Sequence, residues 1–354
     1  MQNISSNTQA PPMDQSVGLW HLAWRRLKRN RSAMFSLGIV AVYFILLVLS
    51  LTGVIVKDWN KEVAISYATP SFIQATSSVM QQSAPVQSTD LASTTPTQDY
   101  GITDPLARDM YAIQIELQHD PHAQTDLAQT LAFGADRWGQ DIIAKTIKAG
   151  ETSILVGILA SLLAVGLGTS IGAISGYFGG WIDDLFNWLY NIFTSIPYML
   201  LILAVAAVLQ QKGILSIILI LGLTGWTGTY RLIRAEYIKH KNREYVLAAQ
   251  AIGVSHFDRL IKHIFPNVSH VTLVQASILL VGFIKSEVIL SFLGFGVPVG
   301  TASWGSMLND AQGEFLLGKW WQLLAATLAM TILVTAFSTF TDALRDALDP
   351  KINT

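Results

Sequence analysis

Long apolar stretches separated by short polar ones dominate the chain. Because a bilayer core about 30 Å thick needs roughly 20 apolar residues to be crossed by a helix, stretches of that length are candidate spans. Six occur, at approximately residues 33–56, 152–175, 182–210, 214–230, 271–296 and 321–341. The fourth is short and contains Gly222, Gly225 and Gly228, so its boundaries are the hardest to place. The pattern predicts an all-α polytopic membrane protein with six transmembrane helices.

Composition supports a membrane protein and excludes several other classes. Hydrophobic residues make up 51% of the 354 residues and charged residues 13%, with a mean hydropathy of +0.42, which is unusual for a soluble domain. The chain has no cysteine, so disulfides, thiol catalysis and cysteine-ligated metals are excluded. A net charge of −1 gives no reason to expect a nucleic-acid partner. The first apolar stretch is too long for a signal-peptide core and lacks a small-residue cleavage site, so we expect it to be retained.

Basic residues predict the orientation. The first 32 residues contain five basic residues against one acid, which places the N-terminus in the cytoplasm. Residues 231–270 contain seven basic residues against three acidic ones. Four predicted helices separate this region from the N-terminus, so both regions are expected on the same side of the membrane. Residues 57–135 then lie outside, with three basic and nine acidic residues. Lys145 and Lys148 also lie outside in this topology and are local exceptions to the charge bias. The predicted orientation rests on the two regions that contain more basic residues.

The outer segment of residues 57–135 has a different composition from the rest. It is rich in Ser, Thr, Gln and Pro and has little periodicity, so we expect a partly disordered insertion with one short helix near 110–117. His119 and His122 are interpreted as solvated loop residues, with metal binding as the alternative. The expected organisation is a cytoplasmic segment (1–32), a first transmembrane helix (33–56), the insertion (57–135), a core of five transmembrane helices (136–342) with a loop at about 231–270, and a cytoplasmic tail (343–354).

A polar, basic stretch on the cytoplasmic side, EYVLAAQAIGVSHFDRLIKHIFPN (244–267), is a candidate docking site. Small residues fall on one helical face and permit close approach of another surface, namely Ala248, Ala249, Ile252, Gly253 and His256. We expect two short helices with a bend at the glycine, and Pro266 to terminate the second because proline lacks an N–H. A partner-docking element and a helix lying on the membrane surface are both compatible with this pattern.

Several motifs resemble those of one transporter family. Two alanines, then a glycine and a proline thirteen residues later, resemble the cytoplasmic loop of ATP-binding-cassette importer permeases; they are Ala248, Ala249, Gly253 and Pro266. Leu247 stands where that family usually has glutamate. The stretches FGADRWGQDIIAK, GYFGGWIDD, ILSFLGFGVP, SWGSMLNDA and RDALDP narrow the resemblance to the second permease subunit of dipeptide, oligopeptide and nickel importers. Ala135 and Gln140 are further departures, from a usual threonine and arginine.

The resemblance implies a type I importer permease with a coupling helix in its cytoplasmic loop, in a bacterial cytoplasmic membrane with both termini cytoplasmic. It implies as partners a second permease subunit, two ATP-binding subunits that hold ATP and Mg²⁺, and an extracytoplasmic binding protein that delivers the peptide. The coupling residues would be Ala248, Ala249, Ile252, Gly253, Val254, Ser255 and Pro266. Which solute is carried stays open among dipeptides, oligopeptides, nickel chelates and other small solutes.

Other functions are less well supported by the residues. GEFLLGKW (313–320) has the glycine and lysine spacing of a phosphate loop, but Trp320 replaces the Ser or Thr that binds magnesium, so we expect no ATP hydrolysis by this chain. An intramembrane enzyme needs paired catalytic groups at bilayer depth, and a secondary transporter needs more membrane charges or an internal repeat; neither is evident. A structural membrane anchor is the remaining alternative.

Two features inside the spans suggest packing or a pathway. Gly168, Gly172 and Gly176 repeat every fourth residue and predict close helix packing, either within the chain or against a second permease. Glu287 is a carboxylate in the fifth span, so it must face protein or water. Ser291, one turn on, is a better placed partner for it than Lys285. We interpret Glu287 as a residue that makes a structural hydrogen bond. The alternative is that it lines the translocation pathway.

Overall fold

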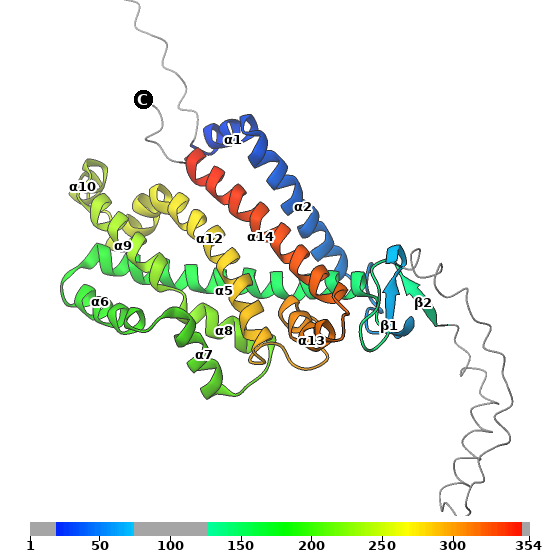
Figure 1. Ribbon diagram of the computed structural model, residues 1–354. Helices are drawn as coiled ribbons and strands as arrows, with labels where there is room; N and C mark the ends of the chain where they lie inside the picture. Colours follow the sequence, from blue (N-terminus) through cyan, green and yellow to red (C-terminus); the bar gives the residue numbers. More distant parts are fainter. Residues whose placement is uncertain (1–18, 74–126, 349–354) are drawn as a thin grey trace, which may run out of the picture.

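The computed structural model describes residues 19–73 and 127–348, with side chains from Trp24 onward. It is a helical bundle with a two-stranded sheet at one end (Figure 1). Its elements are α1 (Leu19–Arg29), α2 (Arg31–Leu51), β1 (Ala64–Pro70), β2 (Ala128–Leu131), α5 (Ile142–Phe178), α6 (Gly180–Ser195), α7 (Tyr198–Leu209), α8 (Ile214–Thr224), α9 (Thr227–Lys241), α10 (Glu244–Ala251), α11 (His256–Asp258), the π-helix η1 (Arg259–Ile264), α12 (Phe265–Phe292), α13 (Trp304–Leu316) and α14 (Trp321–Leu348). The predicted helix near 110–117 and both histidines of the insertion lie outside the described residues.

The apolar helices match the six expected spans in number if one bent pair counts as a span, and several are longer than expected. Within the described residues five helices are long and apolar enough to cross a membrane, or six if one bent pair counts as a span. Three of them extend well beyond their apolar stretches, because polar turns continue the helix at the ends: 142–178, 214–241 and 256–292. Apolar length therefore marked where each span lies but not where its helix stops.

The third predicted span is broken in the middle. α6 and α7 meet at an angle of 89°. Pro197 has no N–H to donate to the preceding turn, and the residue before a proline is pushed out of the helical region. Ile196 accordingly has an extended backbone, with φ −103° and ψ 132°. The Ile196–Pro197 pair in the sequence is a signal for this break, but the run of apolar residues continues across it and was read as one span.

α5 is the central helix of the bundle. It packs against α8, α9 and α12, and more lightly against α2, α13 and α14. Its N-terminus is capped by Asp141, whose side chain accepts a hydrogen bond from the backbone of Ile143 at 3.0 Å. One apolar cluster, around Trp304 and Ile284, fills the half of the bundle nearer the sheet, and another joins α5 to α7, α8 and α12.

The ends of the predicted insertion form an ordered sheet. β1 and β2 pair in parallel, with Ala64 opposite Ala128 and Pro70 opposite Leu131. The segment after β2 returns to this sheet, because Ala135 donates a backbone hydrogen bond to Ala68 at 2.9 Å. Trp321, at the start of α14, donates its indole N–H to the carbonyl of Ala135 at 2.7 Å. The sequence analysis missed these strands because β1 is short and lies beside a polar, aperiodic segment.

Both predicted cytoplasmic regions lie away from the sheet. Figure 1 shows α1, the end of α14 and α10 on the side of the bundle opposite β1 and β2. α1 packs on the end of α14, where Arg26 donates to the carbonyl of Ala347 at 3.4 Å. This arrangement places the two basic regions on one side, as their charges predict.

Candidate functional site

The stretch 244–264 forms a bent unit of two short helical segments. α10 ends at Ala251, and Gly253 follows with a φ of +82°, a left-handed conformation that glycine adopts without steric cost. Val254 donates a backbone hydrogen bond to Ala249 at 3.0 Å and so closes the turn. Ser255 then caps α11, because its hydroxyl accepts from the backbone N–H of Asp258 at 3.1 Å. The bend predicted at the glycine is therefore present, with Ser255 starting the next segment.

The outward face of this unit is more apolar than the small-residue strip predicted. Ile252 is 81% exposed and Phe257 70%, and Leu247 is also exposed, beside Ala248 and Gly253. We call these five residues the coupling face. In the sequence, Leu247 was noted only as a departure from the family pattern. An exposed apolar patch is typical of a surface that another protein or a membrane covers.

Ala249 does not belong to this face, which corrects the predicted strip. It is 4% exposed and lies on the inner side of α10 with Val246. Adjacent residues on a helix are about 100° apart, so Ala248 and Ala249 cannot point the same way. Val254 is half-buried at the turn, and Ser255 is exposed.

A buried arginine holds the two halves of the unit together. Arg259, 6% exposed, donates to the side-chain oxygen of Gln250 in α10 at 2.8 Å and lies 3.0 Å from His256 Nδ1. Its guanidinium lies over the ring of Tyr177 in α5, 5.8 Å from the centroid. The Tyr177 hydroxyl is 3.0 Å from His256 Nδ1. The sequence analysis counted Arg259 only as a charge, although it is the link between the bend and α5.

Pro266 does not terminate a helix, contrary to the prediction. It lies in the first turn of α12, and the helical path runs without a break from His256 to Phe292. Proline is tolerated in a first turn because no intrahelical partner is needed there. Here the preceding π-helix makes this possible: the N–H of Phe265 bonds to the carbonyl of Leu260, five residues back, so the wider turn leaves room for the proline ring.

The three glycines of α5 pack against α9 within this chain. A Cβ at Gly168 would lie 2.6 Å from the carbonyl of Trp226, one at Gly172 would lie 2.8 Å from that of Tyr230, and one at Gly176 would lie 2.6 Å from that of Arg234. Only a hydrogen at these positions lets the two backbones approach so closely. The sequence left open whether these glycines pack within the chain or against a second permease. The contacts among the described residues are those of packing within the chain.

Glu287 is fully buried and paired as expected. It is 0% exposed, and the Ser291 hydroxyl donates to its Oε1 at 2.7 Å. Ser291 Oγ also accepts from the backbone of Val297 at 3.3 Å. These contacts favour the structural interpretation. Lys285, two residues earlier, points elsewhere and is exposed.

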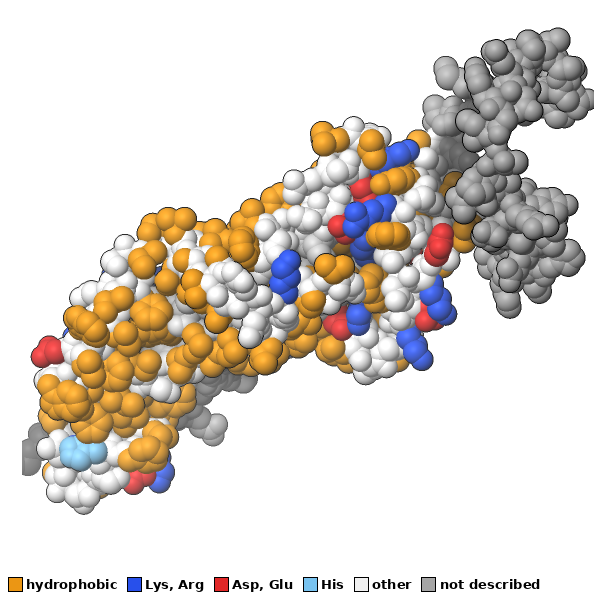
Figure 2. Space-filling view, turned by 90° about the horizontal axis from the view of Figure 1, so that it is seen from below, with side chains coloured by type: hydrophobic (Ala, Val, Ile, Leu, Met, Phe, Trp, Pro, Cys, Tyr) orange, Lys and Arg blue, Asp and Glu red, His pale blue; other side chains and the backbone are white. Residues whose placement is uncertain are grey.

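Lys145, an exception to the predicted charge bias, is paired with acids of this chain. It is 6% exposed, with Nζ 2.7 Å from Asp136 Oδ2 and 3.8 Å from Asp310 Oδ2. Arg137 contacts Asp310 at 3.2 Å, and its backbone N–H donates to Glu314 at 3.3 Å. Figure 2 shows many charged side chains gathered toward the sheet end of one face, a few more at the opposite end, and mainly hydrophobic and neutral side chains between. Lys145 is thus paired with acids of this chain, as is Lys148, which is 2.7 Å from Glu151.

Glu314 is the least well satisfied member of this outer cluster. It is 2% exposed, and its Oε2 has no hydrogen-bond partner among the described residues. Burial, with the nearby carboxylates of Asp136 and Asp310, raises the pKa of Glu314 to about 7. Because α13 carries Glu314, this carboxyl joins that helix to the segment that follows β2.

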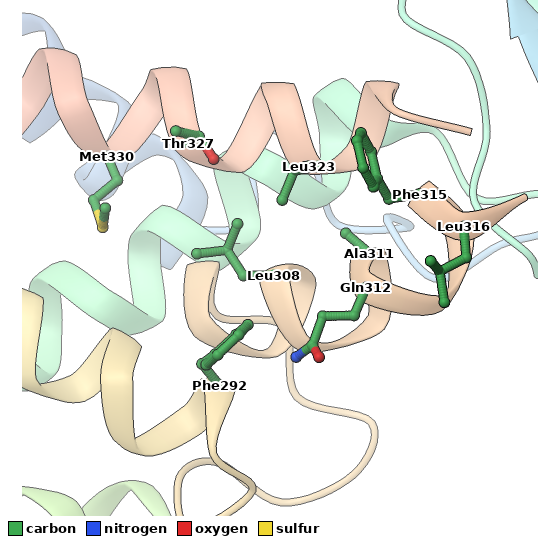
Figure 3. A pocket seen from close by; sticks show the side chains of 9 residues that line it. All are labelled: Phe292, Leu308, Ala311, Gln312, Phe315, Leu316, Leu323, Thr327 and Met330. Carbon is green, nitrogen blue, oxygen red and sulfur yellow. The ribbon is translucent and has the colours of Figure 1, made fainter. Parts of the chain in front are cut away.

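An apolar cavity of about 570 Å³ lies beside the same helix. Figure 3 shows side chains of α13 and α14 around it, with Phe292 at the end of α12. Gln312 and Thr327 are its polar lining residues. No group of three or more His, Asp or Glu residues that would hold a metal ion occurs within 19–73 and 127–348.

Comparison with known proteins identifies the family. Residues 168–354 match the model of the binding-protein-dependent transport system inner membrane component, and residues 18–56 match the N-terminal transmembrane domain of oligopeptide transport permease C. The dipeptide transport system permease protein DppC of Lactococcus lactis is 31% identical over 93% of this chain and 90% of its own length. DppC of Bacillus subtilis is 33% identical over 62% of this chain and 68% of its own length. The oligopeptide transport system permease protein OppC of Salmonella typhimurium is 40% identical over 64% of this chain and 74% of its own length.

A solved structure of the methionine transporter MetNI in an inward-facing conformation aligns with 59% of this chain and 98% of its own, at 14% identity and a TM-score of 0.46. The assignment rests on the sequence relatives. Proteins of this family are the non-catalytic membrane subunits of ATP-binding-cassette importers, whose ATPase is a separate subunit. This chain belongs to the family of binding-protein-dependent transport system inner membrane components.

Proposed function

We propose that this chain forms half of the translocation pathway of an ATP-driven importer for dipeptides or oligopeptides. The relatives named above are dipeptide and oligopeptide permeases, and one of them aligns with nearly the whole chain. The other subunits in this proposal are a second permease, two ATPases that hold ATP and Mg²⁺, and an extracytoplasmic binding protein that delivers peptide. The membrane is the bacterial inner membrane, with both termini cytoplasmic.

The coupling face is the contact with one ATPase in this proposal, and its exposure is the observation that carries it. Ile252 and Phe257 are both mostly exposed and lie on either side of the same bend, and an exposed apolar patch of this kind is typical of an interaction surface. A helix lying on the membrane surface needs no fixed bend, whereas this unit has one, braced by Arg259 and capped by Ser255. A rigid bend with an apolar face suits docking into a groove of a partner whose conformational change must be transmitted to this chain.

Two physical connections carry the movement from this face into the membrane. Phe257 belongs to the same unbroken helix as Phe292, so force on α11 acts along the whole of α12. Val246 and Ile264 pack with Tyr177 and Tyr237, which belong to α5 and α9. Because the α5 glycines lock those two helices together, α5 and α9 move as one body in this proposal, with α12 beside them.

The test is reconstitution of the complete importer in proteoliposomes. Wild-type complexes should show ATPase activity that rises with peptide-loaded binding protein, and should accumulate labelled peptide inside the vesicles. A complex with Phe257→Ser and Ile252→Ser should assemble with the second permease but lose both responses. Normal stimulation of the double variant would refute the coupling face. Accumulation of a nickel chelate and not of any peptide would replace the peptide proposal with the nickel alternative.

A further inference from the structure

Lys285 is a charged group in a membrane-spanning helix, and no acid among the described residues pairs with it. It lies in α12, seven residues before Phe292, and therefore about 10 Å inside that end of the helix. Its side chain is exposed and makes no salt bridge within the described residues. Glu287, the nearest acid in the sequence, is buried on another face and bonded to Ser291. An ammonium group at this depth needs water or an anion, because acyl chains offer neither.

The exposed face around Lys285 is the free side of an otherwise enclosed helix. α12 packs against α5, α8, α9, α13 and α14. The residues left uncovered lie on one stripe, with Ile278 two turns before Lys285 and Ile289 one turn after it. Gly282, three residues before Lys285, would meet no atom within 4 Å if it carried a Cβ, so the space beside the lysine is open. The stripe thus presents one positive charge on an apolar surface with room beside it.

We propose that Lys285 binds the C-terminal carboxylate of the peptide during translocation. This inference rests on the proposed function, since every linear peptide with a free C-terminus carries this anion whatever its side chains. A lysine is a point charge on a flexible stem, so it attracts a carboxylate without demanding a fixed geometry. The contact therefore suits a solute that must be held briefly and released. The apolar residues on either side tolerate peptide side chains of different kinds.

The lack of cysteine allows a direct test on the complete importer in proteoliposomes. Ile289→Cys places one thiol in this chain a turn from Lys285, and a negatively charged methanethiosulfonate modifies thiols that water reaches. Modification is measured on this chain after separation of the subunits. Lys212→Cys, in the exposed loop before α8, is the reactive control, and Leu328→Cys, on the exposed apolar face of α14, is the unreactive control.

Ile289→Cys should be modified, and tri-alanine should slow its modification more than tri-alanine amide does. Adding Lys285→Met should remove this difference, because the charge-assisted contact is lost. Lys285→Met should also reduce import of tri-alanine about tenfold, with Lys285→Arg restoring most of it and Lys212→Met having little effect.

Three results would overturn the proposal. Modification of Ile289→Cys as slow as that of Leu328→Cys would mean that water does not reach this face. Equal protection by the acid and the amide, unchanged by Lys285→Met, would mean that no carboxylate is recognised. Loss of the second permease on purification of the Lys285→Met complex would assign Lys285 to a subunit contact. Failure of the wild-type complex to import any peptide is a separate result, which refutes the proposed function.

Discussion

Arg259 and Gln250 are joined across the bend at Gly253 by a hydrogen bond of 2.8 Å. Gln250 belongs to α10, and Arg259 begins η1, which continues into α12. The bond thus ties the end of a membrane-spanning helix to the segment that presents Leu247 and Ala248. Within the described residues Arg259 has no carboxylate partner, so its contacts with Gln250, His256 and Tyr177 hold it in place.

Replacing this arginine should uncouple the importer without unfolding it. Arg259→Met keeps much of the side-chain volume but removes hydrogen bonds worth about 1.5–3 kcal/mol, so the bend loses its brace. Transport and the peptide-stimulated part of ATPase activity should fall at least about tenfold, while the complex still assembles. Lys262→Met is the matched control, because Lys262 is on the exposed side and its salt bridge among the described residues is with Asp258. Wild-type stimulation in Arg259→Met would contradict the proposed link.

The bend itself can be tested at Gly253. Gly253→Trp adds a bulky side chain on the coupling face, where no atom lies within 4 Å, and should block docking while the spans still insert. Gly253→Ala is the control, because it imposes only the strain of a left-handed residue, about 1 kcal/mol, with little added bulk. Transport should be lost in the tryptophan variant and mostly kept in the alanine variant. If Gly253→Trp transports at the wild-type rate, the coupling assignment is wrong.

Glu287 should act through its hydrogen bond rather than its charge. Glu287→Gln keeps an oxygen that accepts from Ser291 and should preserve assembly and most transport. Glu287→Leu leaves that buried hydroxyl without its acceptor, at a cost of about 1–3 kcal/mol, and should lower the thermal midpoint of the purified complex. Normal assembly of both variants combined with lost transport would favour the pathway interpretation instead.

Glu314 should make the stability of the protein depend on pH. Its pKa is raised to about 7 in the folded state, from 4.5 for an exposed glutamate, so between these values the folded state binds more protons than the unfolded state. Stability from this group is therefore fully present below about pH 4.5 and is lost as pH rises to about 7.

The thermal midpoint of the wild-type complex should fall between pH 5 and 8 by more than that of Glu314→Gln. Glu62→Gln, which removes an exposed acid on the same side of the bundle, is the control and should behave like the wild type. Parallel pH profiles for wild type and Glu314→Gln would show that this carboxyl does not take up a proton on folding.

The membrane fold was largely predictable because bilayer thickness requires apolar runs of one length. The expected spans correspond to the observed helices, and the bend at Gly253 was predicted from the conformational freedom of glycine alone. The Glu287–Ser291 pair was also predictable, since residues four apart share a helical face. Each of these inferences depends on neighbours within a turn or two of the chain.

The errors all involve partners that are distant in sequence or alternatives to regular helix. Pro266 was expected to end a helix, but a π-turn before it accommodates the ring, and nothing in local propensity indicated that turn. Ala249 was placed beside Ala248, although α10 uses its inner side to pack on the bundle. Arg259 had no distinguishing signal, because its partner Tyr177 lies 82 residues earlier in the chain.

The sequence by itself determined that this is a multi-span membrane protein with a bent element between two of its spans, because hydrophobicity and glycine act locally. Only the tertiary structure decided which polar groups are neutralised. Lys145 has Asp136 and Asp310 beside it, and Glu287 is buried among its neighbours, whereas Lys285 is left exposed. Whether a lysine of a membrane protein finds an acidic partner in its own chain depends on how segments far apart in sequence pack together.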